Sequence, residues 1–185
     1  FFSMFTKAFV SLSPSKKIAY LAIFTAACVG INSISILVTP SITLSFNAAF
    51  GFLAGGILGP VGGFSVMFLG DLLGCFTNIF NIVVPNPLVC IASGLLGLIP
   101  GLIMTHVLGN FYLRGVLSFF LCLLVCSAGV NTFAIYIFYS SRSVSYWAYL
   151  LTRMPAFCIV MAVNCVIGVV LAKIINKVNG KFRIS

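Results

Sequence analysis

The sequence has very few charged residues, and only one of them is acidic. Of its 185 residues, 6% are Asp, Glu, Lys or Arg, and Asp71 is the one carboxylate side chain. Hydrophobic residues make up 62% of the chain, and the mean hydropathy is +1.25. A soluble domain covers itself with far more charged and polar surface than this. The composition therefore indicates an integral membrane protein.

The sequence also lacks the motifs and residue groups that most enzymes use. It has no GxxxxGK[ST] phosphate-binding loop, no GxSxG nucleophile motif and no paired carboxylates. It contains one histidine, His106, and its seven cysteines show none of the spacings typical of a metal site. We therefore expect a protein that is not an enzyme and has no cofactor and no metal, so that any ATP hydrolysis belongs to a partner.

Long, continuous apolar segments predict membrane-spanning helices. A transmembrane β-barrel would show short segments of alternating polarity, whereas a helix needs about 20 apolar residues to span the membrane. We predict a single domain over residues 1–185, an all-α integral membrane protein with a bundle of six transmembrane helices. The predicted helices are residues 17–37, 46–58, 61–78, 87–108, 114–138 and 146–175. The second is short and, with its glycines and Pro60, is expected to be the most irregular.

The basic residues predict the orientation of this bundle, because lysine and arginine gather on the cytoplasmic side of membrane proteins. Both termini are predicted to be cytoplasmic, with inner connections at Gly59-Pro60 and at residues 109–114. Arg142 then lies in an outer loop and Arg153 within a span. Residues 1–16 are expected to be an N-terminal interfacial segment rather than a signal peptide, and residues 176–185 a basic cytoplasmic tail. The net charge of +9 thus reflects topology and gives no indication of nucleic-acid binding.

Two charged groups fall within predicted spans, where each needs a partner. Arg153 lies two residues before Pro155 and is our candidate for binding an anionic group of a substrate. The alternative is a structural bond to loop carbonyls or to Asp71. Asp71 is flanked by Gly70 and Gly74, which allow close approach of a neighbouring helix. For Asp71 we favour a structural polar role over a proton or cation relay, because no second carboxylate is present.

Asparagine and aromatic residues gather toward the predicted outer ends of the helices. Amides within spans often line a polar cavity, and a few polar groups among aromatics are typical of a small-molecule site. Together with Arg153, the candidate substrate-binding residues are Phe46, Asn47, Asn78, Asn81, Asn86, Asn131, Tyr136 and Trp147. The aromatic residues around Trp147 are equally typical of a belt at the membrane interface.

Small residues recur every four positions in the first predicted helix. Ala22, Ala26 and Gly30 form a strip on which another helix can approach closely. The strip is either a docking surface for a partner protein or a packing surface within the bundle.

Several segments taken together resemble the S components of energy-coupling factor (ECF) vitamin transporters, the folate-type group in particular. They are GGILGP at residues 55–60, GDLLG at 70–74, ASGLLGLIPG at 92–101, Asn131-Thr132, and LLTRMP around Arg153. The chain length, the six predicted spans and the predicted cytoplasmic termini also match. The resemblance covers most of the chain, and we base it on the whole pattern.

The resemblance implies a multi-pass protein of the bacterial cell membrane, the substrate-binding subunit of an ECF-type ABC importer. Such a subunit captures a water-soluble vitamin with high affinity at the outer face. It docks, here through Ala22, Ala26 and Gly30, on a transmembrane coupling protein joined to two ATPase subunits. The same resemblance implies a mobile outer gate at residues 38–45.

The vitamin and the function each have an alternative. The second helix begins with NAAF at residues 47–50, where folate-type members often have a Phe-Leu-Pro-like start, so both folate and pantothenate remain candidates. Folate carries two carboxylates, whereas the outer half offers only Arg142 and Arg153 as cations, and this favours the smaller pantothenate. The alternative functions are a self-sufficient secondary transporter or channel that uses Asp71, and a structural or assembly subunit of the membrane.

Overall fold

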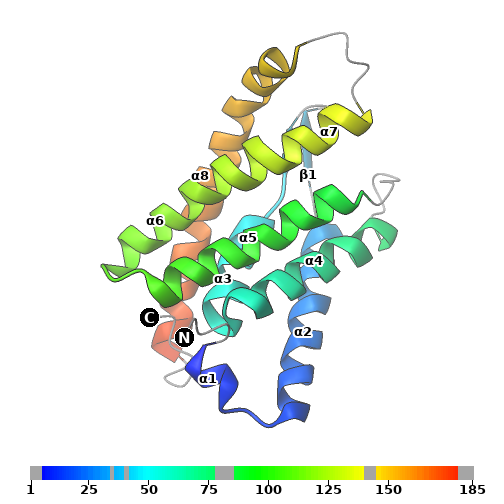
Figure 1. The fold of residues 1–185 in the computed structure, drawn as a ribbon. Coiled ribbons are helices and arrows are strands. Elements are labelled where there is room, and N and C mark those ends of the chain that lie inside the picture. Colours follow the sequence, from blue (N-terminus) through cyan, green and yellow to red (C-terminus); the bar gives the residue numbers. More distant parts are fainter. Residues whose placement is uncertain (1–5, 34–35, 40–41, 78–85, 140–144, 179–185) are drawn as a thin grey trace.

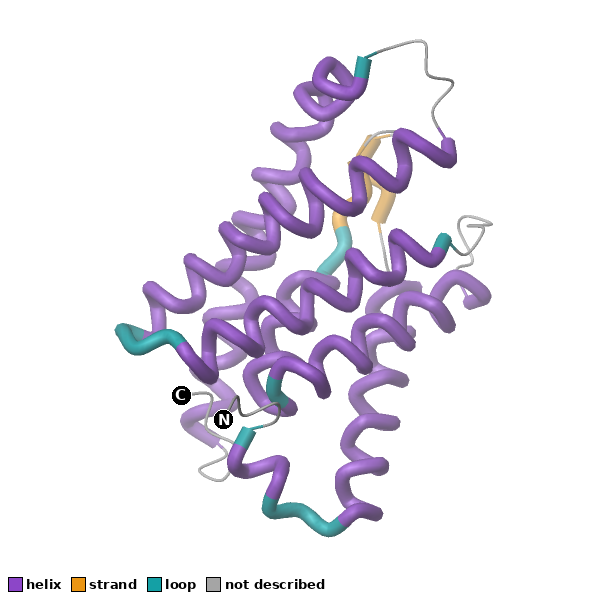
Figure 2. The backbone as a smooth tube through the Cα atoms, viewed as in Figure 1, coloured by secondary structure: helices purple, strands orange, loops and turns teal. Residues whose placement is uncertain are grey.

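The computed structural model describes residues 6–33, 36–39, 42–77, 86–139 and 145–178, and most of them are helical (Figure 1). The helices are α1 (Lys7–Val10), α2 (Pro14–Ser33), α3 (Asn47–Leu58), α4 (Pro60–Thr77), α5 (Pro87–His106), α6 (Phe111–Leu121), the π-helix η1 (Cys122–Asn131), α7 (Thr132–Tyr139) and α8 (Tyr146–Val178). An antiparallel hairpin of two short strands, β1 (Ile36–Thr39) and β2 (Ile42–Leu44), lies between α2 and α3 (Figure 2). This hairpin was not predicted. It begins at Ile36, so the expected helix over residues 17–37 was wrong at its end, and the rest of the hairpin overlaps residues 38–45, the segment expected to be a gate.

Within the part of the chain that the structure describes, four helical stretches are long and apolar enough to cross a membrane. They are Pro60–Thr77, Pro87–His106, Phe111–Phe138 and Tyr146–Ile175. The apolar helix α3 is shorter, with 12 residues, and α2, which carries two lysines in its first turn, is not in this set. The predicted class, a membrane protein built from helices, is therefore confirmed. The count of six spans and the cytoplasmic position of both termini stay predictions. The beginning of α1 and the end of α8 lie at the same end of the bundle, as an even number of spans requires (Figure 1).

Helix α3 forms the centre of the bundle. Figure 1 shows α4 and α5 side by side, α2 beside α4, and the stretch from α6 to α7 beside α8. Helix α3 packs against α4, α5 and α8, and all but Asn47 and Phe50 of its residues are buried. A helix that is apolar all round is stable where protein or lipid covers every side, and neighbouring helices do so for α3. This surrounding explains why α3 is a regular helix and why the expectation of an irregular segment here was wrong.

Glycine residues allow α3, α4 and α5 to meet backbone to backbone. A Cβ atom added to Gly63 of α4 would lie 2.7 Å from the Cα of Gly55 in α3 and 2.7 Å from the carbonyl oxygen of Gly97 in α5. Small residues at such crossings are typical of packed membrane helices. Gly59 ends α3 with a φ of 92°, a conformation that favours glycine, and forms the turn into α4 that the sequence predicted at Gly59-Pro60.

The irregular span is the fifth one. It consists of α6, the ten-residue π-helix η1 and α7. A π-helix bonds each N–H to the carbonyl five residues earlier and often occurs at functional sites. At its end, the buried hydroxyl of Thr132 donates to the carbonyl of Ser127, five residues back, at 2.7 Å. Ser127 and Asn131, four residues apart in η1, both line the cavity that is described next.

Candidate functional site

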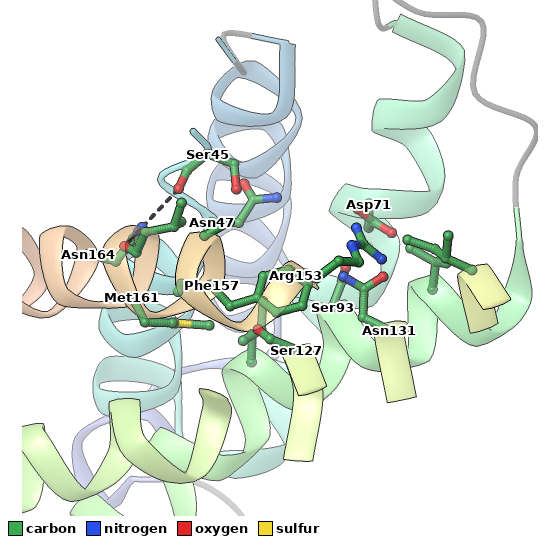
Figure 3. A pocket seen from close by; sticks show the side chains of 16 residues that line it. Ser45, Asn47, Asp71, Ser93, Ser127, Asn131, Arg153, Phe157, Met161 and Asn164 are labelled. Carbon is green, nitrogen blue, oxygen red and sulfur yellow. Dashed lines mark hydrogen bonds between the residues drawn. The ribbon is translucent and has the colours of Figure 1, made fainter. Parts of the chain in front are cut away.

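A cavity of about 260 Å³ lies between α3, α4, α5, η1, α7 and α8. The first turn of α3, the first half of α5 and the first half of α8 supply most of its wall, so it lies toward one end of the bundle. Its polar wall residues are Ser45, Asn47, Asp71, Ser93, Ser127, Asn131, Arg153 and Asn164 (Figure 3). Its apolar wall residues are Ala48, Val89, Leu96, Ile135, Ala156, Phe157, Val160 and Met161.

The cavity brings together some of the residues that the sequence nominated and leaves others out. Asn47, Asn131 and Arg153 line it, and so does Asp71. Four further candidates do not line it: Phe46, Asn86, Tyr136 and Trp147. Two more, Asn78 and Asn81, lie outside the described residues.

The candidates away from the cavity have other surroundings. Asn86 precedes α5, and its Oδ1 accepts a hydrogen bond from the backbone N–H of Leu88 at 3.0 Å. Asn86 is therefore the N-cap of that helix. Trp147 is 71% exposed in the first turn of α8, as expected for an interfacial aromatic residue. Tyr136 packs against Tyr149 with ring centroids 5.9 Å apart, and Tyr149 in turn contacts Arg153. Tyr136 is thus connected to the cavity through Tyr149.

Arg153 is a cation held in place by two aromatic rings of its own helix. Its guanidinium carbon lies 5.5 Å from the ring centroid of Tyr149 and 5.0 Å from that of Phe157. One nitrogen, Nη1, is buried and has no hydrogen-bond partner. Figure 3 shows the guanidinium pointing to the side of the cavity where Asp71 and Asn131 lie. A fixed, partly unpaired guanidinium is well suited to bind a carboxylate or a carbonyl group of a ligand.

Asp71 reaches the same side of the cavity from α4. Its Oδ2 atom is buried without a hydrogen-bond partner, and Ser93 of α5 lines the same cavity. Gly70 lets α2 come close, since a Cβ there would lie 2.6 Å from the Cβ of Cys28. The close helix approach that the sequence predicted at this glycine is thus observed. An unpaired carboxylate oxygen in a membrane protein points to a functional contact.

Asn47 lies in the first turn of α3 and is linked to α2 and α4. Its Nδ2 donates to Oδ1 of Asn32 in α2, and Nδ2 of Asn32 donates to the carbonyl oxygen of Gly70 at 3.2 Å. Its own Oδ1 is buried and unpaired. In η1, Oδ1 of Asn131 is also buried and unpaired.

Four unpaired polar atoms from four helical segments therefore face one cavity. They belong to Asn47, Asp71, Asn131 and Arg153. Leaving a buried polar atom unpaired costs about 1–3 kcal/mol, and native structures contain few such atoms. Their concentration in a single cavity is typical of a binding site whose ligand completes the hydrogen bonds.

Sequence reasoning missed Asn164, which fixes the start of α3. It is fully buried, and its Oδ1 accepts the backbone N–H of Ala49 at 3.0 Å. Its Nδ2 donates to the carbonyls of Ser45 at 2.9 Å and Val160 at 2.8 Å. Phe46, the residue before α3, has no side-chain cap, so Asn164 of α8 supplies one from a distance. The available signal was an asparagine within an apolar span. The wall serines, by contrast, carry no pattern that distinguishes them.

The small-residue strip of α2 faces outward. Ala22, Ala26 and Gly30 are exposed, and a Cβ added to Gly30 would meet no atom within 4 Å. The side of α2 that contacts α4 carries Cys28 and Asn32 instead. The strip is therefore accessible in the described part of this chain. Among the described residues, no group of three or more His, Cys, Asp or Glu side chains is placed to hold a metal ion.

Comparisons with known proteins match the chain as a whole. Residues 13–177 match the family model described as "ECF-type riboflavin transporter, S component". No curated protein matches the sequence. Among solved structures, the fold is similar to the crystal structure of FolT bound with folic acid, with a TM-score of 0.71 and 19% sequence identity. The alignment covers 85% of this chain and 92% of that chain, and at this identity it shows a shared fold.

Proposed function

Because the chain belongs to the family of ECF-type riboflavin transporter S components, we propose that it captures a water-soluble vitamin in the cavity beside Arg153. Membership makes it a vitamin-binding transporter subunit of a membrane and not a catalyst. The vitamin, the docking surface and the inward direction of delivery are the finer parts of this proposal.

The observation that carries the proposal is the set of unpaired atoms in the cavity. One cationic donor, at Arg153, and three acceptors, at Asn47, Asp71 and Asn131, are buried without partners. A small polar molecule with both acceptor and donor groups would satisfy them, and the apolar wall from Phe157 to Met161 would cover its less polar part.

Three vitamins are candidates for this cavity. Riboflavin is suggested by the name of the matching family and folate by the ligand of the FolT structure. Pantothenate is suggested by the wall itself, because Arg153 is the one cation among its described residues. In addition, the volume of about 260 Å³ is below the 300–1,000 Å³ of a drug-sized pocket. The residues thus favour a ligand smaller than folate with a single anionic or acceptor group.

For delivery, the exposed strip of α2 is the proposed contact with a transmembrane coupling protein that carries two ATPase subunits. Its residues Ala22, Ala26 and Gly30 are exposed on the described part of the molecule, which leaves room for a partner helix. Close approach through small residues is how membrane helices associate without a hydrophobic driving force.

The test is vitamin binding by the purified chain alone. We expect one of riboflavin, folate and pantothenate to raise the unfolding temperature and to give saturable binding in calorimetry. Arg153→Ala should weaken that binding by about tenfold to a hundredfold, since a hydrogen bond to a charged group contributes about 1.5–3 kcal/mol. Lys177→Ala is the matched control, because Lys177 is an exposed cation in the last turn of the same helix.

Two results would contradict the proposal. One is the absence of binding for a wide panel of vitamins. The other is transport by the isolated chain in liposomes that Asp71→Asn abolishes, because this would identify a self-sufficient carrier or channel instead.

A further inference from the structure

The direction of the Asn47 amide is fixed by a chain of hydrogen bonds that begins at a backbone carbonyl. The carbonyl oxygen of Gly70 can only accept, so the Asn32 atom 3.2 Å from it must be the donor Nδ2. Oδ1 of Asn32 is then left to accept from Nδ2 of Asn47. Without this chain, the Asn47 amide could turn over and exchange its oxygen for its nitrogen. With it, Asn47 presents an oxygen, Oδ1, as its unpaired atom.

A second acceptor comes from the residue after Gly70. Asp71 lines the same cavity wall, and its Oδ2 atom is buried and unpaired. In its ionised form a carboxyl group has acceptors and no donors, and it is in this form that Oδ2 can accept a hydrogen bond from a ligand. Arg153 is the opposite case, since a guanidinium has donors and no acceptors. The wall therefore offers two oriented acceptors and one oriented donor.

We infer that the bound vitamin donates two hydrogen bonds, one to Oδ1 of Asn47 and one to Oδ2 of Asp71, and presents an acceptor or anion to Arg153. The inference rests on the proposed function and specifies its ligand chemistry, namely N–H or O–H groups at two separate points and an acceptor at a third. Asn32 is a positioning residue, because it does not line the cavity and acts by fixing the Asn47 amide. A ligand that places its own acceptor atoms opposite Oδ1 of Asn47 and Oδ2 of Asp71 is rejected. Lone pairs of the ligand would then face lone pairs of the protein, with no water between them to donate a hydrogen bond.

The experiment measures binding of riboflavin, folate and pantothenate to the full chain by calorimetry. The variants are Asp71→Asn, Asn32→Leu and Asn32→Asp. The control is Ser65→Ala, whose lost hydroxyl donates only to Val61 of its own helix, at 2.9 Å. For whichever probe binds the wild type, Asp71→Asn and Asn32→Leu should each weaken binding by about tenfold or more. Asn32→Asp should stay within about threefold, because a protonated carboxyl can donate to Gly70 and accept from Asn47.

The outcomes separate this inference from the function on which it rests. If no probe binds the wild type, the proposed function fails and the inference fails with it. If a probe binds and both Asp71→Asn and Asn32→Leu stay within threefold, the inference is overturned while the function stands. If Asn32→Asp weakens vitamin binding as much as Asn32→Leu does, Asn32 serves only to link α2 to α4, and its positioning role is overturned. Should Asn32→Leu fail to fold, the nearly isosteric Asp71→Asn still decides the role of the carboxylate.

Discussion

Replacing Asn164 by alanine should loosen the start of α3 and with it one wall of the cavity. Asn164 supplies the side-chain cap that Phe46 does not provide, through its bond to the N–H of Ala49. It also holds Ser45, itself a wall residue, through the carbonyl of that residue. The substitution removes both contacts and leaves the Ala49 N–H buried without a partner.

The expected loss follows from these contacts. The bonds to Ala49 and Ser45 join different helical segments, and hydrogen bonds of this kind in membrane proteins average about 0.6 kcal/mol each. Loss of an asparagine cap costs about 0.5–2 kcal/mol in soluble helices. A central value of about 2 kcal/mol corresponds to a fall of about 4–8 °C in the unfolding temperature for a chain of this size. The third bond, to Val160 of the same helix, adds little because that carbonyl is already in the α-helical ladder.

The assay is thermal unfolding of the purified protein in detergent, with and without a bound vitamin. Asn164→Asp keeps an acceptor for Ala49 and loses the donor to Ser45, so its unfolding temperature should lie between those of the wild type and Asn164→Ala. Ser65→Ala should stay within about 0.5 kcal/mol of the wild type. An Asn164→Ala protein as stable as Ser65→Ala would refute the capping role of Asn164.

The remaining predictions concern the two surfaces built from small residues. Gly55→Ala should destabilise the fold by about 1–3 kcal/mol, because its Cβ would lie 2.8 Å from the backbone nitrogen of Gly101. Gly30→Ala should be neutral or slightly stabilising, because the space around Gly30 is open. Equal unfolding temperatures for the two variants would contradict the packing argument. Ala26→Leu should leave vitamin binding and stability unchanged, since Ala26 is exposed, but should reduce co-purification with the coupling protein at least tenfold. Loss of vitamin binding in Ala26→Leu would mean that the strip serves the fold instead.

Much of the fold followed from local patterns in the sequence. Each predicted span overlaps a helix or, for the fifth, three helical segments in succession, because apolar helices satisfy their own backbone within one stretch of chain. The end of the first span is the exception, since Ile36 and Leu37 lie in β1. The turn at Gly59-Pro60 followed from residue type alone. The π-helix did not, because nothing in the sequence of residues 122–131 distinguishes it from an ordinary apolar helix.

The candidate site was predicted in part. Asn47, Asn131 and Arg153 were found because polar groups are rare in spans and stand out against an apolar background. Asn164 met the same criterion and was overlooked. Ser45, Ser93 and Ser127 could not be found in this way, because a serine in a membrane helix often bonds to its own backbone.

The sequence by itself determined that this protein is a bundle of membrane helices with one acid, one arginine within a span and a strip of small residues, since these are matters of composition and spacing. Only the tertiary structure decided which polar atoms are already paired and which are left for a ligand. Asn32 and Asn47 are 15 residues apart and Asn32 and Gly70 are 38 apart, yet their contacts set the orientation of one amide. Hydrogen-bond satisfaction depends on neighbours in space, so the chemistry of the cavity emerges only when the helices have packed.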